Sequence, residues 1–142
     1  MRSRGYTLVE TVMVLALAGL LVYGGAVTFR GFMPKLRLQA AVWAVRSVLN
    51  EARFKAIWRG EPFRVRFLPG GYRLEAYKGE AGTWRLDRSG VFEGVAVHST
   101  NDPAFHPEGT VSNLATVTVS NSRGEYRITV AISGRIKTVK AS

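Results

Sequence analysis

Hydrophobic and polar positions divide the chain into three stretches with different patterns. Residues 11–29 carry no charged side chain and read TVMVLALAGLLVYGGAVTF. Residues 30–59 repeat apolar side chains every three to four positions, as an α-helix does. Residues 60–142 hold short alternating runs separated by Gly, Pro, Asn and Ser, which is typical of antiparallel strands and turns. The pattern predicts an α+β protein, with a long N-terminal helix packed on a small antiparallel β-sheet or sandwich.

The uncharged stretch is 19 residues long, which is enough to cross a bilayer as a helix. It has no polar face, which argues against a helix buried in a globular core. A cleaved secretory signal is a second interpretation, with Arg2 and Arg4 as its basic region and Gly24-Gly25-Ala26 as its cleavage site. We favour a retained membrane-spanning helix because of the residues that precede it. Basic residues flank both ends of the stretch, so the charges give no orientation.

The helix predicted over residues 30–59 has two apolar stripes. One face carries Leu38, Ala41, Val42, Val45, Val48, Leu49, Ala52 and Ala56, and the opposite face carries Leu36, Ala40, Trp43, Phe54 and Trp58. Two arrangements explain such a helix. Either both faces are buried within its own domain, or one face packs on the sheet and the other on neighbouring subunits.

The C-terminal stretch contains several strand and turn signals. Gly60-Glu61-Pro62 predicts the end of the helix. Turns are expected at Pro69-Gly70-Gly71, at residues 121–124 and at Ser133-Gly134. The expected strands cover residues 63–67, 72–77, 83–86, 95–98, 115–120, 126–132 and 135–139. Residues 99–113 are expected to form a loop around Phe105-His106-Pro107-Glu108-Gly109.

Composition narrows the possible chemistry. The chain has 142 residues, which suits one domain, and it has no Cys, which excludes a disulfide scaffold and Cys-based zinc or redox sites. With two His and neither a Walker-type phosphate loop nor a nucleophile elbow, we expect no enzyme activity, no metal and no cofactor. Twenty Lys and Arg face ten Asp and Glu, and the resulting +10 favours polyanionic partners.

The residues before the uncharged stretch are the most specific signal in the chain. A short basic leader ends at Gly5 and is followed by Tyr6-Thr7-Leu8-Val9-Glu10. The string Gly-aromatic-Thr-Leu-Val-Glu resembles the class III signal of type IV pilins and type II secretion pseudopilins. The resemblance implies that a prepilin peptidase cleaves between Gly5 and Tyr6 and methylates the new amine of Tyr6, although Tyr6 departs from the usual Phe. It also implies an assembly role for Glu10, whose carboxylate meets the N-terminal amine of a neighbouring subunit.

The order of the predicted elements resembles one branch of that superfamily, the GspH/FimT-type minor pseudopilins. The match rests on the Phe-x-Pro-x-Gly loop at residues 105–109 and on Gly134-Arg135-Ile136-Lys137. It implies a leader at 1–5, a transmembrane and filament-core helix at 6–29, an amphipathic helix half at 30–59 and a β domain at 60–142.

The resemblance also implies a function and a location. The chain would be a structural subunit of a type IV pilus or a type II secretion pseudopilus. Its partners would be prepilin peptidase, other pilins or pseudopilins, the inner-membrane assembly platform and membrane lipid. It would cross the bacterial inner membrane once, with its C-terminal domain outside the cytoplasm, and then enter a filament at the cell surface or in the periplasm.

The excess of basic residues among the last 20 positions suggests an alternative function, that of a DNA-binding minor pilin of a natural-competence system. FimT-like proteins bind double-stranded DNA through a Gly-Arg-x-Arg element in this hairpin, and Lys137 replaces the second Arg here. The candidate DNA-binding residues are Arg135, Lys137, Arg127, Arg123 and Lys140. A solvated basic edge strand, or contact with an acidic neighbouring subunit, would explain the same charges. A secreted basic β-protein that discards its apolar stretch is a third hypothesis.

Overall fold

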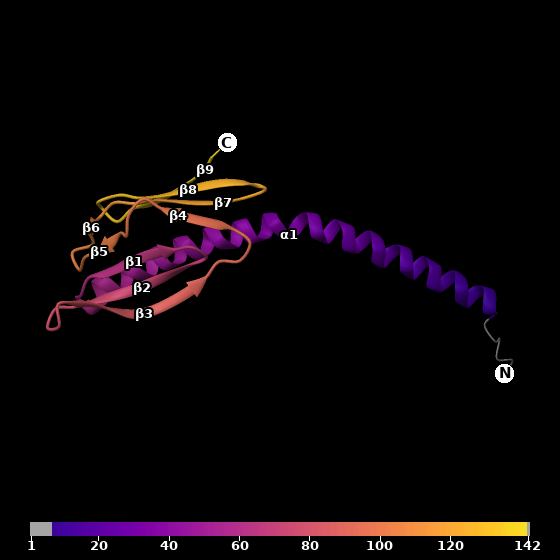
Figure 1. Cartoon of the computed structure of the whole chain (residues 1–142), viewed down its shortest axis with the longest axis horizontal. Helices are drawn as coiled ribbons and strands as arrows, with labels where there is room; N and C mark the ends of the chain where they lie inside the picture. The colour runs from indigo at the N-terminus through magenta and orange to yellow at the C-terminus, as the bar shows by residue number, and fades with distance from the viewer. Residues whose placement is uncertain (1–6, 142) are drawn as a thin grey trace. The chain divides into compact units, whose positions relative to one another are not determined.

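The computed structural model describes the backbone of residues 7–141 and the side chains of residues 7–24 and 31–141. The chain divides into two compact units between Met33 and Pro34. In the described residues, one helix is followed by nine strands (Figure 1). The elements are α1 (Leu8–Arg59), β1 (Phe63–Leu68), β2 (Gly71–Lys78), β3 (Thr83–Val91), β4 (Ala96–Ser99), β5 (Ala104–Phe105), β6 (Val111–Ser112), β7 (Thr116–Asn121), β8 (Gly124–Val130) and β9 (Ile136–Ala141).

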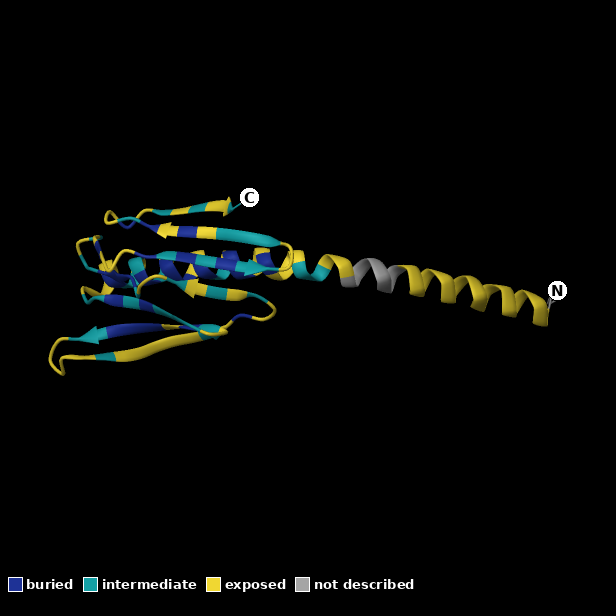
Figure 2. Cartoon of the chain, turned by 45° about the horizontal axis from the view of Figure 1, so that its top comes forward, coloured by how far each residue is buried: buried dark blue, intermediate teal, exposed yellow. Residues whose placement is uncertain are grey.

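The first unit consists of the N-terminal part of α1, which Thr7 caps. The Glu10 N–H donates to the Thr7 hydroxyl at 3.3 Å, and the Thr11 hydroxyl donates to the Thr7 carbonyl at 3.2 Å. Every residue from 7 to 24 is exposed (Figure 2). Across residues 7–24 and 31–141, no helix is apolar over a long enough stretch to cross a membrane, so the predicted span is not confirmed.

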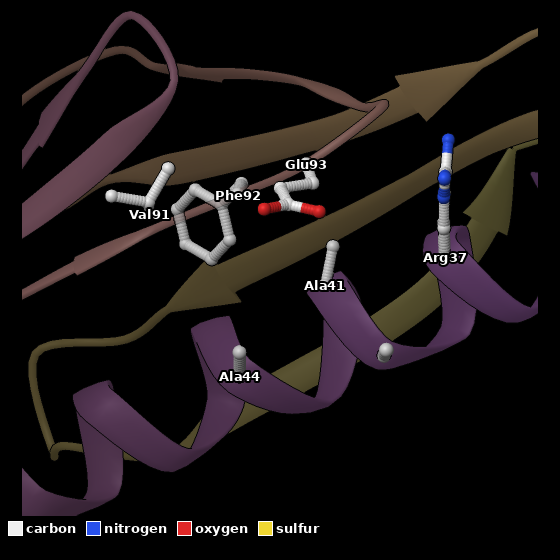
Figure 3. A pocket seen from close by; sticks show the side chains of 7 residues that line it. Arg37, Ala41, Ala44, Val91, Phe92 and Glu93 are labelled. Carbon is white, nitrogen blue, oxygen red and sulfur yellow. The ribbon is translucent and has the colours of Figure 1, made fainter.

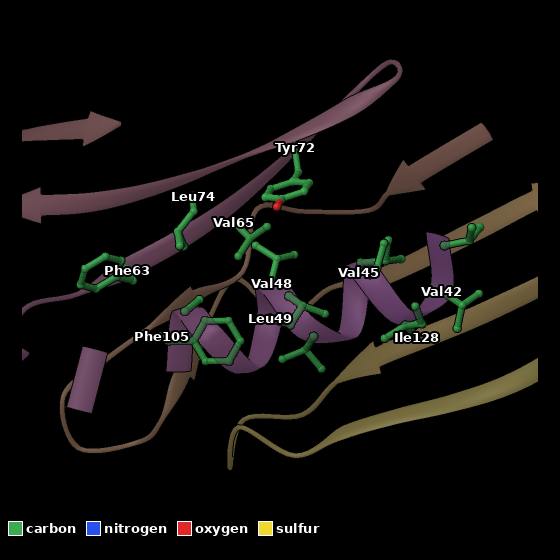
Figure 4. Close-up of a cluster of buried hydrophobic side chains, with 14 of the residues drawn as sticks. Val42, Val45, Val48, Leu49, Phe63, Val65, Tyr72, Leu74, Phe105 and Ile128 are labelled. Carbon is green, nitrogen blue, oxygen red and sulfur yellow. The ribbon is translucent and has the colours of Figure 1, made fainter. Parts of the chain in front are cut away.

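The second unit combines the rest of α1 with two antiparallel sheets (Figure 1). One sheet has the strand order β3-β2-β1-β5-β6, and the other has the order β4-β7-β8-β9. Side chains from α1 and from both sheets form one core, with Val48 and Leu49 near Phe105 and with Val42 near Ile128 (Figure 4). The predicted α+β class, a helix packed on a small antiparallel sandwich, is confirmed.

One predicted stripe of the helix is buried and the other is not. All eight members of the first stripe, from Leu38 to Ala56, belong to the core. On the opposite face Trp43 is 75% exposed, Trp58 73% and Phe54 66%. Burial of both faces within one domain is therefore wrong for this unit. We call the exposed stripe, Leu36, Ala40, Trp43, Phe54 and Trp58, the outer helix face.

The strands differ from the predicted ranges where hydrogen bonding overrides alternation. β3 extends to Val91 because it pairs with the whole of β2. β8 stops at Val130, since the next residues form a turn in which the Ala131 N–H donates to the Arg135 carbonyl at 2.9 Å. The predicted loop over residues 99–113 contains the short strands β5 and β6, and β5 pairs with β1 by placing Phe105 opposite Phe63.

Candidate functional site

Of the three residues that the leader resemblance singled out, the structure describes one. Gly5 and Tyr6 lie outside the described residues. Glu10 lies in the first turn of α1 and is exposed. A carboxylate there interacts favourably with the helix dipole. Its predicted role in assembly stays a prediction.

The two C-terminal loop motifs lie against each other. The Val111 N–H, just after the Phe-x-Pro-x-Gly loop, donates to the Ile132 carbonyl at 2.9 Å. A Cβ atom placed on Gly134 would lie 2.8 Å from the Gly109 carbonyl oxygen. Both glycines have positive φ angles, +83° at Gly109 and +74° at Gly134. Position 134 therefore requires glycine for two reasons: its backbone is left-handed, and a Cβ would collide with the Gly109 carbonyl oxygen.

Side chains from other elements fix this loop pair. Arg53 of α1 donates from Nη1 to the Gly134 carbonyl at 3.3 Å. Phe105, the first residue of the loop motif, is fully buried in the core. His106 Nε2 and the Ser112 hydroxyl are 2.8 Å apart and share a hydrogen bond. The motif residues thus make packing contacts, and they present no group of reactive side chains.

The basic hairpin places two candidate DNA-binding residues on one exposed face. β8 and β9 pair so that Thr129 is opposite Lys137 and Arg127 is opposite Val139. Residues directly opposite each other, and those two apart on one strand, share a face, so Arg127 and Lys137 lie on the same side. Both are exposed, as is Arg135 in the turn before β9. Arg127 also forms an ion pair with Glu125 at 3.0 Å, which partly neutralises it.

The other two candidate residues lie elsewhere. Lys140 is opposite Tyr126, whose side chain packs against the core, so Lys140 belongs to the inward face of this sheet. Arg123 lies in the turn between β7 and β8. These residues line a cavity of about 130 Å³ together with Lys35, Leu38 and Gln39 of α1. The sequence analysis did not single out Lys35, because no local pattern relates it to Arg123, 88 positions later, or to Lys140, 105 positions later.

A groove of about 290 Å³ lies between α1 and the end of β3 with the two residues that follow it (Figure 3). The small side chains of Ala41 and Ala44 face Val91 and Phe92 across it. Arg37 and Glu93 supply its charged groups. Within residues 7–24 and 31–141, no three His, Cys, Asp or Glu side chains are close enough to hold a metal ion.

An ion-pair network connects α1 to β3. The Lys55 ammonium lies 2.7 Å from Glu51 and 2.6 Å from Asp87, and Arg59 lies 2.9 Å from Asp87. Burial alone would raise the pKa of the Asp87 carboxyl, but hydrogen bonds from Lys55 and Arg59 outweigh it and hold that pKa below its ordinary value. Burial would likewise lower the pKa of Lys55, but its hydrogen bonds to Asp87 and Glu51 raise that pKa. This arrangement is a structural cross-link.

Comparison with known proteins gives a family and a fold. The family model for the type II transport protein GspH matches residues 41–134. A structure of the minor pseudopilin EpsH from the type 2 secretion system of Vibrio cholerae is similar, with a TM-score of 0.63 and 14% identity over 73% of this chain and 97% of that one. A crystal structure of the same minor pseudopilin has a TM-score of 0.63 and 13% identity over 75% of this chain and 95% of that one. A comparison with curated protein sequences found no match.

Proposed function

The chain belongs to the GspH family of type II transport proteins, and from this premise we propose that it is a minor pseudopilin, a structural subunit of a type II secretion pseudopilus. The family match over residues 41–134 is the observation that carries the proposal. The matched region contains most of the buried helix stripe and the whole Phe-x-Pro-x-Gly loop, and it ends at Gly134, the first residue of the second loop motif. The fold, which is similar to that of a pseudopilin, supports the same conclusion.

The proposed route to the filament begins with the leader. Prepilin peptidase cleaves between Gly5 and Tyr6 and methylates the Tyr6 amine, while residues 6–29 hold the chain in the inner membrane with its C-terminal domain outside the cytoplasm. The uncharged stretch at 11–29 supports this route. An unpaired Glu10 carboxylate is costly in lipid, so pairing it with a neighbour's N-terminal amine favours entry into the filament.

Mass spectrometry of the native protein tests this route. We expect a mature chain that begins at methylated Tyr6. A chain that begins after Ala26 would instead support a secreted protein and contradict the proposal. Glu10→Gln keeps the shape of the side chain and removes its charge, so this variant should be cleaved normally but enter filaments poorly.

We propose further that the outer helix face contacts neighbouring subunits. Large apolar side chains that stay exposed on a folded unit often mark an interaction surface. Phe54 and Trp58 stack with their ring centres 6.5 Å apart, and Trp43 lies three turns earlier on the same face. Together they present an aromatic surface that is largely exposed on the folded unit.

Cysteine cross-linking in cells tests this surface, since the chain has no native Cys. Single Trp43→Cys and Trp58→Cys variants should form disulfides with Cys-substituted pseudopilins. The control, Thr129→Cys, is an exposed position on the outward side of β8 and should not form them. Equal cross-linking at all three positions would contradict the assignment of the outer helix face.

A DNA-binding minor pilin of a competence system is the second candidate function. It is favoured by exposed Arg135 and Lys137, neither of which forms an ion pair within the described part of the chain. Binding of the full chain in neutral detergent to duplex DNA should fall with salt, and Arg135→Gln with Lys137→Gln should reduce the logarithmic salt slope by about 1.8. Arg73→Gln with Arg85→Gln removes the same charge from exposed positions on β2 and β3 and should change the slope less.

A further inference from the structure

Seven exposed positions of α1 follow the spacing of a coiled-coil seam. The steps between them are alternately four and three residues, and the positions are Leu36, Ala40, Trp43, Ser47, Asn50, Phe54 and Ile57. Such steps average 3.5 residues, the period at which one line of side chains keeps facing a partner helix that winds around the first. We call these seven residues the helix seam. It lies within the second unit and shares four residues with the outer helix face.

The helix seam is open to solvent, whereas the stripe from Leu38 to Ala56 on α1 is buried against the sheets. Within the seam, Trp43 is 75% exposed, Ile57 52% and Leu36 42%. The residues from Leu36 to Ile57 cover three heptads, which is long enough for a coiled-coil pattern to be informative. A line of this period is typical of packing against a second helix.

A cavity of about 240 Å³ lies in the middle of the helix seam. Trp43, Arg46, Ser47 and Asn50 line it, and they occupy positions i, i+3, i+4 and i+7 of the helix. Residues three and four apart are neighbours on a helix surface, so these four side chains surround one depression. In a coiled coil, each seam side chain of one helix is a knob that inserts into a hole formed by four residues of the facing helix. The cavity has the arrangement of such a hole.

The side chains around this hole favour an acidic knob. Arg46, Ser47 and Asn50 all carry hydrogen-bond donors, and no carboxylate is among the described residues that line the hole. Within the described part of the chain, none of these three side chains has a hydrogen bond or an ion pair. A neighbouring helix that covered Arg46 without a carboxylate would leave its charge buried and unpaired, which is costly. A Glu or Asp knob removes that cost and accepts charge-assisted hydrogen bonds from the guanidinium.

A second copy of this chain suits the hole less well than a different subunit does. In a parallel pair of identical helices, the residues beside the seam pair across it, and Arg46 would lie near Glu51 of the second copy. Glu51 is already engaged, because its carboxylate lies 2.7 Å from Lys55 and 3.0 Å from Arg88. The carboxylate is therefore expected from a helix of different sequence.

We propose that the helix seam packs knobs-into-holes against an α-helix of a neighbouring pseudopilin, which places a Glu or Asp side chain in the hole beside Arg46. The proposal rests on the proposed function, which supplies the neighbouring subunit. It adds the packing period and the partner's chemistry to the contact proposed for the outer helix face. The candidate DNA-binding residues Arg135 and Lys137 are not part of it.

Cysteine cross-linking of the full chain in cells tests the packing and the choice of partner. Asn50→Cys is combined with single Cys substitutions at successive helix positions of each pseudopilin made by the same cells. We expect disulfides with one pseudopilin at positions that recur every three to four residues and that flank a Glu or Asp. Disulfides without that period, or with no pseudopilin, would overturn the packing. A dominant disulfide between two Asn50→Cys copies of this chain would overturn the choice of partner.

Charge reversal tests the chemistry of the hole, with binding between the full chain and the cross-linked pseudopilin measured in neutral detergent. Arg46→Glu should weaken binding about 30-fold or more, because it places two carboxylates together at the interface. Replacement of the partner's acidic residue by Arg should restore the affinity to within about threefold. The matched control, Arg73→Glu, reverses an exposed charge on β2 and should change the affinity less than about threefold.

Thermal unfolding checks that both variants of this chain are folded. Equal losses for Arg46→Glu and Arg73→Glu would show general charge attraction and would overturn the proposal. A loss at Arg46→Glu that the partner's reversed charge does not repair would overturn the acidic knob.

The failure of this inference is distinguishable from the failure of the proposed function. An Arg46→Glu chain that is cleaved at Gly5 and enters filaments as the native chain does would overturn only the helix seam. A native chain that begins after Ala26 would overturn the proposed function, and the partner of the seam with it.

Discussion

Replacement of Gly134 by Ala tests whether the two loop motifs pack as described. Gly134 has a φ of +74°, and a left-handed backbone costs a residue with a Cβ about 1–2 kcal/mol. The new methyl would also lie 2.8 Å from the Gly109 carbonyl oxygen and 2.9 Å from Arg53 Nε. Relief of those contacts moves Arg53 and weakens its hydrogen bond to the Gly134 carbonyl, which adds about 1 kcal/mol. We therefore expect Gly134→Ala to lower the free energy of unfolding by about 2–3 kcal/mol.

Substitutions at two other glycines separate the cost of the left-handed backbone from the cost of the close contacts. Gly109 has a φ of +83°, but its Cβ would meet only Ile57 Cδ1, at 3.9 Å. Gly109→Ala should therefore cost only the backbone term of about 1–2 kcal/mol. Gly79 has open space around it and no left-handed φ, so Gly79→Ala should be nearly neutral.

Urea unfolding of the full chain in neutral detergent, followed by the fluorescence of its three Trp residues, provides the assay. We expect the largest shift in midpoint for Gly134→Ala, a smaller one for Gly109→Ala and almost none for Gly79→Ala. If Gly134→Ala unfolds like Gly109→Ala, the close contact among the two loops and Arg53 is wrong.

Two further predictions concern the core and the helix–sheet ion pairs. Leu49→Ala should cost about 2–5 kcal/mol in the same assay because Leu49 is fully buried, whereas half-exposed Ile57→Ala should cost under about 1 kcal/mol. Asp87 has a lowered pKa in the folded chain, so its contribution is present above its unfolded pKa of about 4 and is lost as pH falls through the lower folded value. Asp87→Asn should therefore lower the unfolding free energy by about 1 kcal/mol at pH 7, since it removes the carboxylate that pairs with both Lys55 and Arg59 and leaves Lys55 with Glu51 alone. A penalty that persists unchanged at pH 2.5 would contradict the assigned pKa direction.

The sequence predicted the elements whose identity depends on local pattern. The 3–4 residue spacing from Leu38 to Ala56 identified the buried helix stripe, because one face of a helix repeats at that period. Alternation over residues 63–67 identified β1 (Phe63–Leu68), because successive side chains of a strand point to opposite faces. Boundaries were less accurate where a non-local contact decides them. β3 is longer than predicted because it pairs along the whole length of β2, and charged residues along β3 conceal the strand pattern.

The candidate site was less predictable, because its residues are related only through the fold. Five basic residues near the C-terminus looked like one group in the sequence. Strand register separates them, since Arg127 and Lys137 share the outward face of β8 and β9 and Lys140 belongs to the inward face. The fold places Lys140 and Lys35 of α1 around one cavity, a proximity that no spacing in the sequence encodes.

The helix illustrates why two apolar stripes with the same period have different partners. The buried stripe contains Ala41, Ala52 and Ala56, whose small side chains let the sheets approach the helix closely. The outer helix face contains Trp43 and Trp58, which are too large for such close packing on a sheet. Because the sheets already cover the smaller face, the aromatic side chains stay exposed in this unit, and we have proposed that neighbouring subunits cover them. The core of the unit is complete without the outer helix face. Covering this face on assembly would therefore release further hydrophobic free energy.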